Sequence, residues 1–156
     1  MDAKFINPIV DAFIEVMPQV GFPLPRRSRI YLQDRTIISN GVVLKVSFTN
    51  QMQGKVIYNM TADTARYVAS IMMFGVPVTK FNDMAQSALR EMSNMLTART
   101  ATNFTKFGME EVDITPPELL IEEDQMIKIS DSQFLTVEME FGDYKMDVAL
   151  VVERDA

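Results

Sequence analysis

Ser87, Glu91 and Asn94 are the residues of this chain whose types and spacing most suggest chemistry. At about 100° per residue, steps of four and three along an α-helix bring all three side chains onto one narrow face. The apolar residues of the same stretch fall on a neighbouring, wider face, which comprises Ala85, Ala88, Leu89, Met92, Met95 and Leu96. The pattern therefore predicts one helix that buries an apolar stripe and holds an acid and an amide together outside it.

The composition narrows the chemistry that this face can perform. The chain has no histidine and no cysteine, which excludes imidazole general-base catalysis, phosphohistidine transfer, thiolate nucleophiles, disulfides and the commonest zinc sites. Fifteen basic and 21 acidic residues give a net charge of −6, which argues against nonspecific nucleic-acid binding. The apolar runs are too short to span a bilayer, so we expect no membrane segment and a cytoplasmic protein.

Three helices are predicted from the periodicity of apolar residues and from their start and stop signals. They cover Asn7–Val20, Thr61 to about Phe74, and Asp83 to about Phe107. For the long third helix we expect a capping box formed by Asp83 and Gln86. This helix carries the candidate site.

Strands are predicted at Val42–Thr49, Lys55–Met60, Val112–Ile114, Met126–Ile129, Leu135–Phe141 and Tyr144–Val152. The last two flank Gly142-Asp143, a two-residue turn typical of a β-hairpin. Because the strands come in runs instead of alternating with helices, the order favours an α+β fold with a largely antiparallel sheet and helices on one face. The length suits a single domain over residues 1–156.

A basic run, Arg26-Arg27-Ser28-Arg29, precedes the predicted strands. We interpret it as a solvated loop or a strand edge, and contact with an acidic partner is the less favoured alternative.

The first helix contains a possible echo of the candidate site. Asp11, Glu15 and Pro18 repeat the spacing of Ser87, Glu91 and Asn94. If the two halves are related, the first copy could not perform the same chemistry, because proline has no side-chain amide. That would leave one site per chain.

The spacing of Asp or Ser, three residues, Glu, two residues and Asn on a long helix resembles the motif of the CheC/CheX/FliY phosphatases of bacterial chemotaxis. Ser87, Glu91 and Asn94 match it position by position. Two further stretches, Phe5-Ile6-Asn7-Pro8 and Asp113-Ile114-Thr115-Pro116-Pro117, are similar to the CheX branch. Length, one intact motif and element order also favour CheX over CheC, which normally carries two motifs. The run Ser93–Thr100 departs from the family, which often has small residues there, and its bulkier residues could alter how closely a partner docks.

The resemblance implies a CheX-like fold and a phosphatase that hydrolyses the aspartyl phosphate of a CheY-like response regulator. Asn94 would position the attacking water and Glu91 would form an ion pair with a lysine of the regulator, while Ser87 would make a supporting contact or leave room for the partner. The Mg²⁺ of the reaction would belong to the regulator, so we expect no cofactor on this chain. The resemblance also implies a homodimer joined through sheet edges, and the long C-terminal strands would need such an edge covered.

Two other interpretations stay open at this point. The chain could be a non-catalytic module that docks a response regulator, or another flagellar or signalling partner, without turnover. It could also be a structural α+β domain in which Glu91 and Asn94 are merely solvated.

Overall fold

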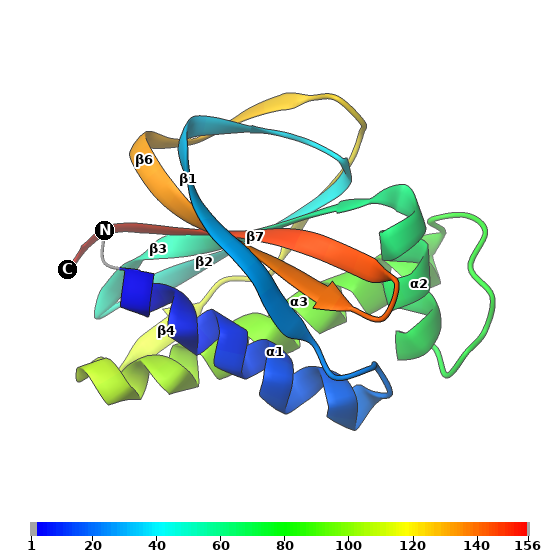
Figure 1. The fold of residues 1–156 in the computed structure, drawn as a ribbon, viewed down its shortest axis with the longest axis horizontal. Helices are drawn as coiled ribbons and strands as arrows, with labels where there is room; N and C mark the ends of the chain where they lie inside the picture. Colours follow the sequence, from blue (N-terminus) through cyan, green and yellow to red (C-terminus); the bar gives the residue numbers. More distant parts are fainter. Residues whose placement is uncertain (1–2, 156) are drawn as a thin grey trace.

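The computed structural model describes residues 3–155, and within them the chain forms seven strands, three α-helices and two short 3-10 helices (Figure 1). The helices are η1 (Ala3–Ile6), α1 (Asn7–Val20), α2 (Ala62–Met72), α3 (Asp83–Asn103) and η2 (Phe104–Phe107). The strands are β1 (Arg26–Ile38), β2 (Gly41–Asn50), β3 (Met52–Thr61), β4 (Val112–Ile114), β5 (Glu118–Ile121), β6 (Met126–Phe141) and β7 (Tyr144–Asp155).

All seven strands belong to one antiparallel sheet in the order β1-β6-β7-β3-β2-β4, and β5 also pairs with β2. Helices α1 and α3 run side by side in opposite directions on one face of this sheet, and the main apolar core lies between them and the strands (Figure 1). The predicted α+β fold, with an antiparallel sheet and helices on one face, is therefore confirmed.

A second, smaller core occupies the opposite face of the sheet. There the β1–β6 pair arches over the other strands (Figure 1). The apolar residues enclosed by this arch are Ile37, Val43, Ile57, Ile129, Phe134, Ala149 and Val151. The helices thus cover one face of the sheet, and strands of the sheet itself cover part of the other.

The predicted helices are present, with one correction at the start of α3. The side chain of Asn82, and not that of Asp83, caps this helix by accepting a hydrogen bond from the backbone N–H of Ala85 at 2.9 Å. Gln86 consequently lies one position too far along the helix for a capping box, and its amide donates to the carbonyl of Phe81 at 2.7 Å. The last predicted turn of α3 is the 3-10 helix η2, which ends at Gly108 with a left-handed φ of 79°.

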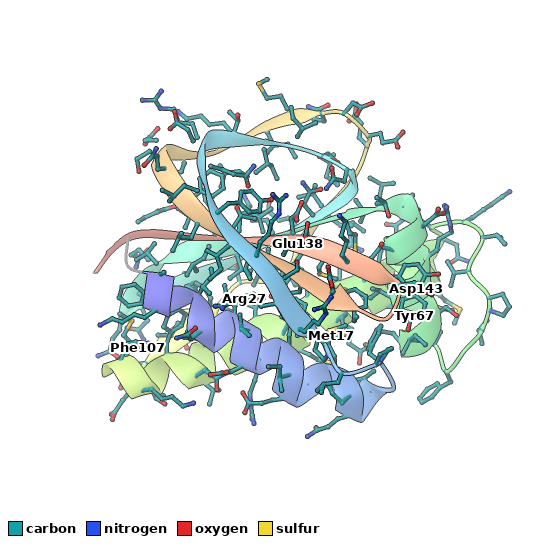
Figure 2. The ribbon with its side chains drawn as sticks, viewed as in Figure 1. Met17, Arg27, Tyr67, Phe107, Glu138 and Asp143 are labelled. Carbon is teal, nitrogen blue, oxygen red and sulfur yellow. The ribbon has the colours of Figure 1, made fainter. Side chains whose placement is uncertain are left out.

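Helix α2 is held against the end of the β6–β7 hairpin. Its first turn is capped by Thr61, because the threonine hydroxyl accepts from Thr64 N–H at 3.1 Å. The Tyr67 ring stacks on Tyr144 with centroids 4.0 Å apart, next to the turn residue Asp143 (Figure 2). The predicted hairpin is confirmed, and Gly142 begins its turn with a φ of 64°.

Three strands differ from the prediction. The segments Met126–Ile129 and Leu135–Phe141 are parts of the single long strand β6, and strands β1 and β5 were not predicted. The basic run lies at the start of the edge strand β1, so its interpretation as a strand edge is confirmed.

The basic run is paired with acidic residues of β6. Arg26 forms an ion pair with Glu140 at 2.7 Å, and the Ser28 hydroxyl donates to the buried Glu138 carboxylate at 2.6 Å. This hydrogen bond lowers the pKa of Glu138. These contacts join β1 to its neighbour.

Candidate active site on helix α3

Ser87, Glu91 and Asn94 lie together on the outward face of α3, and all three are exposed. Within residues 3–155 their side chains take part in no hydrogen bond or ion pair. The opposite face of the helix is buried in the main core and comprises Ala85, Ala88, Leu89, Met92, Ser93, Leu96, Thr97, Thr100, Ala101 and Asn103. The predicted arrangement of a buried stripe beside a polar face is therefore what the structure shows, except that Met95 is only half-buried.

Helix α3 is fixed to the sheet directly behind the candidate site. The Tyr58 hydroxyl of β3 and the Thr97 hydroxyl of α3 share a buried hydrogen bond of 2.7 Å, and Thr97 also donates to the carbonyl of Ser93 at 2.7 Å. Burial raises the pKa of Tyr58, so this phenol stays protonated. A side chain on the outer face of an anchored helix keeps its position, which is what a positioning role in catalysis needs.

The residues that depart from the family pattern point mostly away from the polar face. Leu96, Thr97 and Thr100 are buried, so their bulk fills the core and not the surface. One turn beyond Asn94 on the exposed stripe lies Ala98, which presents only a methyl group. The neighbours of Asn94 at this surface also include the exposed Arg90 one turn earlier and the half-buried Met95.

The echo of the motif in α1 has a different environment. Glu15 accepts a hydrogen bond from Arg99 at 2.8 Å and another from the amide of Asn103 at 3.0 Å. Asp11 lies 3.9 Å from the ammonium of Lys106. The hydrogen bond from Arg99 lowers the pKa of Glu15, and its partial burial opposes that effect. The two acids of α1 thus join α1 to the C-terminal half of α3 and its 3-10 extension.

The partners of Glu15 were not predicted from the sequence. Arg99 and Asn103 are four residues apart on α3, as Asp11 and Glu15 are on α1. Arg99 and Asn103 both contact Glu15, whereas Asp11 pairs with Lys106. The matching spacing on the two helices therefore does not by itself predict these partners.

The chemistry available on the α3 face is that of a carboxamide beside a carboxylate. An exposed amide can donate one hydrogen bond and accept another, and an exposed carboxylate can pair with a cation from another molecule. Among the residues that the structure describes, no three acidic side chains gather as a metal site would require. No helix in the same range has the length and apolarity to cross a membrane.

Comparison with known proteins gives these residues a family context. The sequence model of the family described as "Chemotaxis phosphatase CheX" matches residues 42–140, which is more than half of the chain and includes the whole polar face. The chain is also 29% identical over 128 residues to the CheY-P phosphatase CheX of Thermotoga maritima, covering 82% of each protein.

Solved structures share the fold. A CheX from Desulfovibrio desulfuricans superposes with a TM-score of 0.84 at 16% identity, over 96% of this chain and 99% of that one. The CheX–CheY–BeF₃–Mg²⁺ complex from Borrelia burgdorferi gives a TM-score of 0.76 at 22% identity, over 96% and 98% of the two chains. The matched family model, together with the motif on the exposed face of α3, shows that this chain belongs to the chemotaxis phosphatase CheX family.

Proposed function

We propose that this protein is a phosphatase that hydrolyses the aspartyl phosphate of a CheY-like response regulator. Its membership of the CheX family and its similarity to a CheY-P phosphatase support this reaction class. The observation that carries the proposal is the Asn94 amide. It is exposed, it has no partner among the described residues 3–155, and it lies on a helix anchored through Thr97 and Tyr58.

Asn94 is the water-positioning residue of this proposal. Hydrolysis requires a water oxygen in line with the scissile P–O bond. A new P–O bond forms, the bond to the aspartate carboxylate breaks, and both protons of the water leave with inorganic phosphate. A neutral carboxamide can hold that water in one orientation by accepting one hydrogen bond and donating another. It also brings no negative charge toward the phosphoryl oxygens. Asn94 therefore contributes by positioning, and the charge stabilisation comes from the regulator.

Glu91 docks the regulator in this account. A carboxylate is a poor direct neighbour for a phosphoryl group, because the two negative charges repel each other. Glu91 lies one turn from Asn94 and has no partner in the part of the chain that the structure describes, so it is available to pair with a lysine of the regulator. Ser87, one further turn away, makes a supporting contact or leaves room for the partner.

Mg²⁺ enters the reaction on the regulator, where it neutralises charge that develops on the phosphoryl oxygens. We propose no cofactor for this chain, and we place the reaction in the cytoplasm.

We also propose a homodimer joined through sheet edges, on the basis of the family resemblance. The additional argument from the C-terminal strands is wrong, because β6 and β7 both have neighbours on either side within the chain. One outer edge belongs to the long, exposed strand β1, and the other belongs to the short strands β4 and β5. The β1 edge offers the longer surface for such pairing.

The proposal is tested by measuring phosphate release from a phosphorylated CheY-like regulator in Mg²⁺, with and without this protein. In parallel, binding to the same regulator loaded with beryllofluoride and Mg²⁺ is measured. Accelerated release together with binding supports the phosphatase. Binding without acceleration, across several regulators, would instead establish a non-catalytic docking module. The absence of both binding and acceleration would indicate a structural domain.

A further inference from the structure

Three large apolar side chains are exposed close together where the chain passes from α2 into α3. Phe74 is 100% exposed, Met84 67% and Val76 52%. Together they line a groove in the α2–α3 connection with Met73, Pro77 and Val78. Figure 1 shows this connection as the green loop at the end of the molecule where α3 begins.

Phe74 is held in an unfavourable conformation. Its φ is 59°, in the left-handed region that large L-residues rarely adopt. The turn is nevertheless well bonded, because Phe74 N–H donates to the carbonyl of Ile71 at 3.1 Å and Gly75 N–H to that of Ser70 at 2.8 Å. A bulky aromatic residue that is both strained and fully exposed contributes nothing evident to folding. Such outliers tend to occur where a segment is used for binding or switching.

The apolar groove is continuous with the polar face of α3. Met84 precedes Ser87 by one turn, and both lie on the exposed stripe that continues to Glu91 and Asn94. At 1.5 Å per residue, Met84 is about 10 Å from Glu91 along the helix axis. A standard interface of about 800 Å² per partner has a radius of roughly 16 Å. A regulator centred on Glu91 would therefore cover Met84 as well.

The polar face alone offers little affinity. Exposed ion pairs such as the one proposed for Glu91 contribute weakly, and protein interfaces draw most of their binding energy from a few buried aromatic and other large side chains. Phe and Met are enriched at the centres of such interfaces. The groove next to the motif supplies both residue types, at Phe74 and Met84.

We propose that Phe74, Val76 and Met84 form an apolar anchor through which this protein binds its response regulator. The side chains pack against apolar surface of the regulator while Asn94 reaches the phosphoryl group. This inference rests on the proposed function and names the affinity-determining part of the same docking surface.

The test uses Phe74→Asn, because asparagine tolerates the left-handed conformation and replaces the apolar ring with a small polar amide. Met84→Ala is paired with Met126→Ala, a control residue that is 66% exposed on β6, on the other side of the sheet from the helices. We measure the Kd for the regulator loaded with beryllofluoride and Mg²⁺, the kcat at saturating phosphorylated regulator, and the Tm.

We expect Phe74→Asn to raise the Kd at least 10-fold and Met84→Ala at least 3-fold, with kcat within 2-fold of wild type. Met126→Ala should leave the Kd unchanged, and Phe74→Asn should not lower the Tm. An unchanged Kd for Phe74→Asn would overturn the inference, as would variants that alter self-association in sedimentation without altering the Kd. Failure of the proposed function would be seen separately, because wild-type protein would then bind the regulator without accelerating phosphate release.

Discussion

Helices α1 and α3 carry acids at the same spacing but use them differently. On α1, Glu15 is bound by Arg99 and Asn103, and its negative charge serves the packing of the two helices. On α3, the carboxylate of Glu91 and the amide of Asn94 have no partner within residues 3–155. The same spacing therefore produces a structural contact on one helix and an open face on the other.

This difference shows that spacing alone does not define a site. What distinguishes the two helices is which groups lie opposite each acid and what stands at the third position. On α1 that third residue is Pro18, which has no side-chain donor or acceptor, whereas Asn94 has both. The acids of α1 consequently stabilise the fold, whereas Glu91 and Asn94 of α3 are available for a partner.

The largest difference in stability is expected between variants of the two asparagines of α3. Asn103 is buried and its amide donates to Glu15 and to the carbonyl of Pro8 at 3.1 Å. Asn103→Ala should lower the free energy of unfolding by about 1–3 kcal/mol, because those acceptors lose their donor. Asn94→Ala should raise it by up to about 0.5 kcal/mol, because alanine is the better helix former at an exposed position. Urea unfolding measures both, and equal losses would contradict the comparison.

Substitution of Glu91 should affect binding of the regulator, whereas substitution of Glu15 should affect stability. Glu91→Ala should weaken binding of the beryllofluoride-loaded regulator about 3- to 5-fold, more at low salt than at high salt, with the Tm unchanged. Glu15→Ala should do the reverse and cost up to about 1 kcal/mol of stability without changing the Kd. Binding titrations and thermal unfolding of both variants test this, and a salt-independent loss of affinity in Glu91→Ala would argue against an ion pair.

The smallest effect is a pH dependence confined to the α1 copy. The pKa of Glu15 is lowered in the folded protein, chiefly by the hydrogen bond from Arg99. Its ionised form therefore stabilises the fold above the ordinary value of 4.5, and that contribution disappears as the pH falls through the lowered pKa. The Tm difference between wild type and Glu15→Gln should shrink between about pH 5 and pH 3. A difference that persists or grows in acid would contradict the assigned contact.

Much of this structure could be predicted from the sequence where the local pattern is strong. The C-terminal hairpin follows from regular alternation around Gly142-Asp143, and the site face follows from the helical periodicity of α3. The chain order of these elements was enough to indicate an α+β fold.

The remaining features depend on contacts distant in sequence. Strand β1 carries Arg26, Arg27 and Asp34 and has no clean alternation, because an edge strand with an exposed face need not be apolar on both sides. The cap of α3 was misplaced by one position because Asn82 and Asp83 are both good capping residues. The contact of Glu15 with Asn103 spans 88 residues, and the exposure of Phe74 depends on a turn that ends α2 at Met72. No local sequence pattern predicts the Glu15–Asn103 contact or the exposure of Phe74.

The most direct test is the decay of a phosphorylated CheY-like response regulator in Mg²⁺, followed with wild-type protein, Asn94→Ala and Asn103→Ala at a temperature where all three are folded. The account predicts that Asn94→Ala loses at least about 100-fold of the acceleration because the attacking water is no longer held. Asn103→Ala should retain it within about 3-fold, because that amide serves only the helix packing. Near-normal turnover by Asn94→Ala would contradict the account, since the exposed amide would then have no part in the reaction.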